Sequence, residues 1–289
     1  MAIDYDRLLS LQIPDREQRY TWRDTALYAL GLGAGLDPLK ADDLRFVYET
    51  EMRALPTMAV VLAHPGFWIR DLETGIDWVR VVHGEQGLEI HRELPVEGTV
   101  VGQNRVIDVV DKGEGRGALV VSERRLFDKS TGDLLATIRQ VTFCRADGGF
   151  GGPARTLPPP YAIPDRAPDL VFDISTTPQC ALVYRLSGDF NPLHVDPAVA
   201  KSAGFDRPIL HGLATYGIAG RAVLAGLCEN DPSRMIGLDG RFTAPVYPGE
   251  TFRTEIWRDP ANFSQASFRV RCVERDIVAI NNGLAVLRR

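Results

Sequence analysis

The residues with the greatest potential for chemistry lie in residues 184–212, which read YRLSGDFNPLHVDPAVAKSAGFDRPILHG. Asp189 and His194 are five positions apart, and Pro192 disfavours helical geometry at Asn191, so we expect a turn or loop here. A carboxylate beside an imidazole can divide acid and base work on one water molecule, because histidine titrates near neutral pH. The plainer alternative is that Asp189 closes an Asx-turn and that His194 is a hydrogen-bonded loop histidine.

The next segment, GLATYGIAGRAVLAGL, predicts a helix over residues 213–227. Its glycines lower the intrinsic helix propensity, so we expect it to form mainly because a sheet wraps closely around it. Free backbone N–H groups at its start, His211-Gly212, are natural donors to a carbonyl oxygen that develops negative charge. Gly212 would leave room for a ligand, although a glycine there could equally serve packing alone. For His211 we favour a structural role.

Three weaker motifs lie elsewhere in the chain. DKGEGRG, residues 111–117, resembles a phosphate loop, but no helix follows it, so a dinucleotide site is rejected and a hairpin turn is preferred. Lys112 could still offer a point charge to a phosphate. HGEQ, residues 83–86, is typical of a polar turn, although His83 could face a ligand.

The third motif is RFTAPVYPGE, residues 241–250, which predicts a strand that runs into a Pro-Gly turn. Phe242 is most simply a core residue or the wall of a pocket. Arg241 is either a solvated strand residue or a second phosphate contact. Motifs for a nucleophilic serine, a P-loop or a zinc protease are absent from the sequence.

Composition and charge exclude several classes of protein. The net charge of -5 makes nucleic acid a poor partner, and no apolar run is long enough to suggest a membrane span. The four cysteines are widely spaced, so no zinc site is expected and a reduced, cytoplasmic protein fits best. The first residues, MAIDYDRLLS, lack the apolar region of a signal peptide.

The element order predicts two similar halves. Glycine and proline dominate residues 148–164, which we expect to link an N-terminal half, residues 1–147, to a C-terminal half, residues 165–289. Each half shows helical patterns followed by strands, which favours an α+β fold with antiparallel sheets. The helical patterns lie at 21–32, 54–63 and 213–227, and the strand-like runs at 78–83, 88–93, 99–111, 117–128, 134–145, 181–186, 235–242, 251–258, 267–274 and 277–287.

Taken together, residues 184–217 resemble the signature of (R)-specific enoyl-CoA hydratases of the MaoC-like group. They are especially similar to the two-hot-dog hydratase unit of peroxisomal multifunctional proteins and their bacterial relatives. The likeness extends to YALGLGAG, HGEQGLEIHRELP, DKGEG and RFTAPVYPGE, and so covers most of the chain. The resemblance implies a double hot-dog fold, with two antiparallel sheets that each wrap a central helix.

The resemblance also implies roles for single residues. Asp189 and His194 would be the catalytic pair, Asn191 would orient the pair or the water, and the Gly212 N–H would hold the thioester oxygen. The residues that would contact the acyl-CoA substrate are His83, Gly84, Lys112 and Phe242, with Arg241 as a further candidate. Residues 1–147 contain no D-x-N-P-x-H motif, so the first half would bind the acyl chain and CoA without catalysing.

We therefore expect reversible hydration of trans-2-enoyl-CoA to (3R)-3-hydroxyacyl-CoA, with no metal and no redox cofactor. Two alternatives stay open, a thioesterase and a non-catalytic subunit that binds acyl thioesters. A homodimer is expected because hot-dog sheets leave an edge that must be paired or covered. The sequence leaves open the acyl chain length, the pathway, and which member of the pair is the base.

Overall fold

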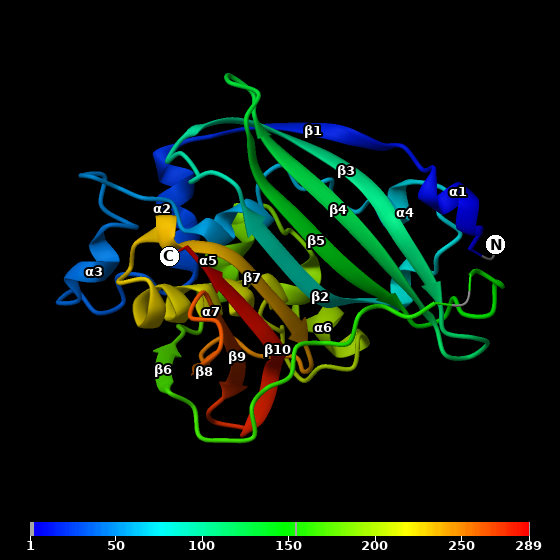
Figure 1. Ribbon diagram of the computed structural model, residues 1–289. Coiled ribbons are helices and arrows are strands. Elements are labelled where there is room, and N and C mark those ends of the chain that lie inside the picture. Colours follow the sequence, from blue (N-terminus) through cyan, green and yellow to red (C-terminus); the bar gives the residue numbers. More distant parts are fainter. Residues whose placement is uncertain (1–2, 154, 289) are drawn as a thin grey trace.

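Antiparallel strands form one continuous sheet in the computed structural model, which describes residues 3–153 and 155–288 (Figure 1). The strand order is β1-β3-β4-β5-β2-β7-β10-β9-β8-β6. The strands are β1 (Ile13–Tyr20), β2 (Val81–Ile90), β3 (Gly98–Asp111), β4 (Ala118–Asp128), β5 (Leu134–Cys144), β6 (Leu170–Ser175), β7 (Met235–Phe242), β8 (Thr251–Arg258), β9 (Gln265–Cys272) and β10 (Ile277–Leu287).

Helices lie mainly in the segments between these strands. The α-helices are α1 (Tyr5–Leu9), α2 (Trp22–Gly31), α3 (Ala41–Leu44), α4 (Trp68–Asp71), α5 (Cys180–Tyr184), α6 (Pro197–Ser202) and α7 (Gly212–Leu227). The 3₁₀-helices are η1 (Pro56–Val60), η2 (Trp78–Arg80), η3 (Arg185–Ser187), η4 (Pro192–His194) and η5 (Pro232–Arg234). None of the helices described is long and apolar enough to cross a bilayer.

The prediction of an α+β fold with antiparallel strands is confirmed, but the two sheets are not separate. β2 of the first half pairs with β7 of the second, from Glu85 opposite Arg241 to Glu89 opposite Gly237. Both strands would otherwise be open sheet edges with unpaired backbone groups. Their pairing therefore makes one sheet that curves around the interior of both halves (Figure 1).

The long helix α7 packs against both halves, and its glycines permit the close approach. A Cβ added at Gly217 would lie 2.6 Å from the Leu32 side chain, and one at Gly220 would lie 2.6 Å from that of Thr57. A Cβ at Gly226 would lie equally close to Phe172 of the second half. The predicted helix with a tightly wrapped surround is therefore confirmed.

The first half has no comparable long helix among its described residues. The expected helix over 54–63 is the short η1, whose five residues are all buried. Its extension is prevented by Ala63, which has a positive φ of 47°. The buried Arg124 side chain donates hydrogen bonds to the carbonyl groups of Ala59 and Val60, which a longer helix would have used internally.

Several local predictions of helices, strands and turns differ from the structure. HGEQ is not a turn but part of β2, with a bulge in the pairing between His83 and Glu85. The strand-like run 181–186 is helical, in α5 and η3, because it lies outside the sheet. The strands β1 and β6 were missed. Both end the sheet, and β1 lacks a clear alternation of buried and exposed residues, whereas β6 is a short strand of six residues. No helix or strand occurs in residues 148–153 and 155–164.

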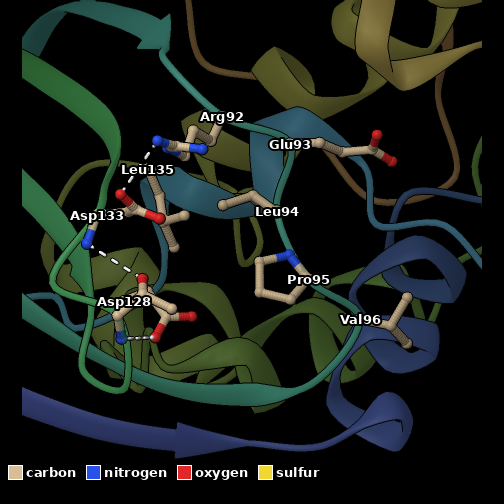
Figure 2. Close-up of a pocket in the computed structure, with 9 residues that line it drawn as sticks. Arg92, Glu93, Leu94, Pro95, Val96, Asp128, Asp133 and Leu135 are labelled. Carbon is tan, nitrogen blue, oxygen red and sulfur yellow. Dashed lines mark hydrogen bonds and ion pairs between the residues drawn. The ribbon is translucent and has the colours of Figure 1, made fainter.

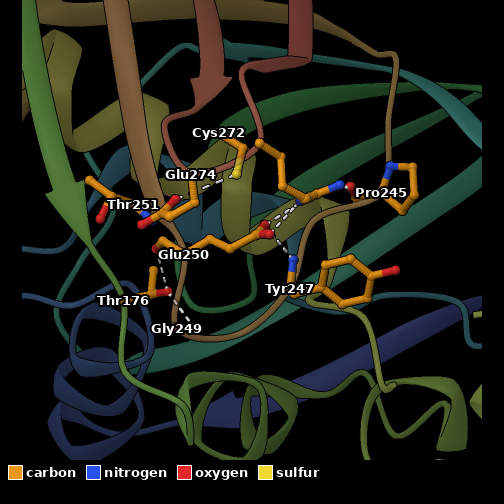
Figure 3. A network of polar contacts seen from close by, with 9 residues as sticks. Thr176, Pro245, Tyr247, Gly249, Glu250, Thr251, Cys272 and Glu274 are labelled. Atoms are coloured by element: carbon orange, nitrogen blue, oxygen red, sulfur yellow. Dashed lines mark hydrogen bonds and ion pairs between the residues drawn. The ribbon is translucent and has the colours of Figure 1, made fainter. Parts of the chain in front are cut away.

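A network of polar contacts braces the chain that leads to the start of α7 (Figure 3). The buried Glu250 carboxylate accepts hydrogen bonds from Arg275 Nη2 at 2.8 Å and from the Tyr247 N–H at 2.8 Å. The Leu210 N–H donates to the Val246 carbonyl in the same loop at 2.8 Å. The turn after β7 therefore fixes the backbone just before residues 211 and 212.

A buried ion pair joins α7 to the first half. Arg221 Nη2 lies 2.9 Å from Asp43 Oδ2, and its Nη1 donates to the Leu32 carbonyl at 2.7 Å. Both charged side chains are under 10% exposed. Removing one partner of such a pair leaves an uncompensated buried charge.

We expect Arg221→Met to lower the free energy of unfolding by about 3 kcal/mol, because it leaves the buried Asp43 carboxylate without a counter-charge. Urea denaturation followed by circular dichroism measures this. Arg234→Met is the matched control, since Arg234 pairs with the exposed Glu229 and should contribute less than about 1 kcal/mol. Equal losses in the two variants would contradict a structural role for the buried pair.

Candidate functional site

Asp189 and His194 face each other across the loop that connects η3 and η4. Asp189 Oδ1 accepts a hydrogen bond from the Asn191 N–H at 3.1 Å, so the Asx-turn is present. Its other oxygen, Oδ2, lies 3.9 Å from His194 Nε2. Asp189 can therefore close the Asx-turn through Oδ1 and act on a substrate water through Oδ2 at the same time. Asn191 holds the same loop by accepting from the Leu193 N–H at 3.0 Å.

The hydrogen bonds of His194 define how it can act. Its Nδ1 lies 2.8 Å from the Ile209 carbonyl oxygen, which can only accept, so Nδ1 carries the hydrogen. In the neutral ring Nε2 is then a free acceptor that points toward Asp189. Burial lowers the pKa of His194, against opposing effects of Asp189 and of the Ile209 carbonyl. His194 is therefore neutral at pH 7 and able to accept a proton.

His211 contacts both members of the pair. Its ring stacks on that of His194, with centroids 3.7 Å apart, and its Nε2 lies 3.3 Å from the Asp189 carbonyl oxygen. Burial lowers the pKa of His211 to about 4, so this ring is also neutral. It is the N-cap residue of α7, but its side chain makes no capping hydrogen bond. The expected structural role thus takes the form of support for the pair.

The start of α7 brings an amide donor beside the pair. Gly212 is the first residue of α7, and its N–H makes no hydrogen bond within residues 3–153 and 155–288. A Cβ at this position would lie 3.3 Å from the Phe242 ring. Phe242 in turn contacts His83 edge-on, with centroids 4.8 Å apart. The Gly212 N–H of the second half therefore lies near Phe242, which is in contact with His83 of the first half.

The remaining predicted contact residues lie in the β3–β4 turn, in β7 and in β2. Lys112 sits in the β3–β4 turn with its Nζ 5.0 Å from the Phe143 ring, and takes part in no ion pair that the described residues make. Arg241 of β7 pairs at 3.3 Å with Glu85 of the neighbouring strand β2, so its charge is already compensated. Gly84 lies at the bulge of β2, where a Cβ would approach the Val141 carbonyl to 3.2 Å.

Sequence reasoning missed His64, which follows the buried run that contains η1. Burial lowers its pKa to about 3, together with Arg124, and Asp189 acts on it in the opposite direction. The Asp189 charge likewise raises the pKa of His83, His194 and His211, against the larger effect of burial. Four of the five histidines in the chain therefore lie within electrostatic reach of one carboxylate. The sequence signal for His64 is weak, a lone His-Pro-Gly after an apolar run.

Two other features bear on ligand binding. Asp189, His194 and His211 each offer one ligand atom, and these atoms lie within 4.8 Å of one another, a spacing that could hold a metal ion. The sequence prediction that no metal is needed stays a prediction. A surface cavity of about 400 Å³ between residues 92–96 and the β4–β5 turn contains none of the predicted site residues (Figure 2).

Comparisons with known proteins match both halves of the chain. Residues 18–146 match the model of the MFE-2 hydratase 2 N-terminal domain, and residues 161–282 match that of the MaoC like domain. A probable enoyl-CoA hydratase 2 from Dictyostelium discoideum is 40% identical over 99% of this chain and 97% of its own length.

Solved structures agree with this. A MaoC-like dehydratase from Phytophthora capsici has a TM-score of 0.89 and 33% identity, covering 99% of this chain and 98% of its own. The peroxisomal multifunctional enzyme type 2 of Drosophila melanogaster has a TM-score of 0.81 and 38% identity, covering 95% of this chain and 48% of that one. The predicted double hot-dog architecture is thereby confirmed. The chain belongs to the family of MaoC-like dehydratases that carry an MFE-2 hydratase 2 N-terminal domain.

Proposed function

We propose that this protein adds water reversibly to trans-2-enoyl-CoA and forms (3R)-3-hydroxyacyl-CoA. The observation that carries the proposal is the Asp189–His194 pair, with Oδ2 and Nε2 3.9 Å apart, beside the unbonded N–H of Gly212. A gap of that length is suited to two groups that share one water molecule. The family to which the chain belongs includes proteins named enoyl-CoA hydratase 2.

The geometry supports a simple sequence of bond changes. His194 Nε2 accepts a proton from the water while the water oxygen bonds to C3 of the substrate. The electron pair of the C2–C3 double bond then moves toward the thioester oxygen, where the Gly212 N–H stabilises the negative charge. Loss of one such donor typically costs on the order of 3 kcal/mol. C2 finally takes a proton from the Asp189–His194 pair, which returns to its initial protonation state.

The neutral histidines suit this chemistry. Burial keeps His83 and His211 uncharged, with the pKa of each lowered to about 4. Neutral rings in both places leave the developing negative charge on the thioester oxygen to the Gly212 N–H. No redox cofactor is required, because the reaction moves a proton and a hydroxide without a net electron transfer. The proposal also assigns no role to a metal, since the Gly212 N–H takes the place of a Lewis acid at the thioester oxygen.

We propose that the protein is cytoplasmic and forms a homodimer. The four cysteines are free and buried, as expected in a reducing compartment. The strands β1 and β6 end the sheet and would be covered by a partner. Light scattering after size-exclusion chromatography measures the mass, and organelle fractionation tests the location, since the Drosophila relative is named as peroxisomal.

We expect Asp189→Asn and His194→Gln each to lower kcat for crotonyl-CoA hydration by about 10²-fold or more, because each removes a proton-transfer group. Loss of the enoyl-thioester absorbance measures the rate, and circular dichroism confirms the fold. Asp196→Asn is the matched control, since Asp196 caps α6 in the same loop region. Near-normal turnover in both variants would contradict the mechanism, whereas release of free CoA thiol would indicate a thioesterase.

The pH profile gives a second test. The pKa of His194 lies below its ordinary value of 6.5, so the ring stays neutral as the pH falls through 6.5. We therefore expect kcat/KM for crotonyl-CoA to stay level through pH 6.5 and to fall only when the lower pKa is passed. An acid limb centred at or above pH 6.5 would show that the base is exposed to solvent, contrary to the structure.

A further inference from the structure

Arg124 of β4 is a buried cation without an anionic partner. Its side chain is 6% exposed, and burial lowers its pKa to about 10. Nη2 donates to the Val60 carbonyl at 2.6 Å, but the buried Nε has no hydrogen-bond partner among the described residues. It belongs to none of the ion pairs that those residues form. Buried charges are normally paired, so the structure offers a positive site that a ligand could complete.

His64 lies beside this cation because its neighbours fix the backbone there. The Ala63 N–H donates to Gln18 Oε1 at 2.6 Å. A Cβ at Gly102 of β3 would lie 2.6 Å from the Ala63 oxygen and 3.1 Å from Arg124 Cδ, so the three are in close contact. The chain therefore delivers the His64 side chain next to the guanidinium.

The His64 ring has a defined hydrogen-bond donor. The Gly66 N–H donates to His64 Nδ1 at 3.2 Å, so the hydrogen of the neutral ring is on Nε2. His64 is exposed to water, so its Nε2–H is open to a ligand. It follows η1, which contacts α7, β2 and β5, so the ring borders the side of the first-half sheet that faces α7. Asp189 and His83 also act on its pKa, which places it within electrostatic reach of the candidate active site.

The strand register orders these groups along the first-half sheet. Lys112 lies in the β3–β4 turn, at one end of the first-half sheet. His83 pairs with Thr142 of β5 near that end, whereas Arg124 pairs with Ile138. Four residues of β5 separate these two levels, or about 13 Å. If CoA phosphates meet Lys112 and the reacting carbons lie near His83, the acyl chain extends toward Arg124 and His64.

We propose that His64 and Arg124 form a subsite at the acyl end of the site that receives a carboxylate, so that the protein accepts enoyl-CoA substrates derived from dicarboxylic acids. This proposal rests on the proposed function. A carboxylate fits better than a neutral oxygen because the guanidinium lacks a counter-charge and His64 Nε2 adds a second donor. Charge-assisted hydrogen bonds of this kind are about twice as strong as neutral ones.

Binding of saturated acyl-CoA thioesters tests the subsite without turnover. Isothermal titration calorimetry on the full chain compares three pairs of equal length: hexanoyl- with adipoyl-CoA, octanoyl- with suberoyl-CoA, and decanoyl- with sebacoyl-CoA. We expect at least one dicarboxylic member to bind about tenfold more tightly than its partner. We expect His64→Leu to reduce that preference to less than about threefold, because it removes the exposed donor without changing the core.

Two controls separate this subsite from other causes. His91→Leu should keep the preference, since His91 hydrogen-bonds Thr137 and belongs to none of the contacts that hold His64 or Arg124. Arg124→Met should abolish it, with thermal unfolding to confirm that η1 is retained. Equal affinity within every pair, or a preference that His64→Leu leaves unchanged, would overturn the proposal. Hydration of crotonyl-CoA by the unaltered protein reports separately on the proposed function.

Discussion

The close packing of α7 against both halves of the sheet is the constraint on which the site depends. Gly217 and Gly220 allow side chains of the first half to approach the helix backbone, and Arg221 ties the helix to Asp43. The first turn of α7 is thereby held at a fixed depth in the fold. That depth places the N–H of Gly212 beside the loop that carries the carboxylate and the imidazole.

Charge in the site is concentrated on a single carboxylate. Asp189 lies within electrostatic reach of four histidines, and burial keeps the pKa of each below its ordinary value. At neutral pH these imidazole rings are therefore polar but uncharged. An uncharged surround leaves the developing charge on a thioester oxygen to the fixed amide dipole of α7, which needs no reorganisation during the reaction.

The two halves contribute different chemistry to one site. The second half supplies the loop of Asp189 and His194 and the amide of Gly212. The first half supplies the wall, with His83 in β2 and His64 after η1. Because η1 is short and pinned by Arg124, the interior of the first-half sheet is not filled by a long helix. The halves thus share a fold but differ in what the sheet encloses.

The sequence by itself determined the antiparallel strands with clear alternation, the glycine-rich helix and the loop of Asp189 and His194. These depend on local pattern and on turn chemistry, which a single sequence carries. The tertiary structure decided what depends on contacts between distant segments. The joining of β2 to β7, the edge strand β1 and the place of His64 are of this kind, because the pattern within a segment does not say which distant segment it contacts.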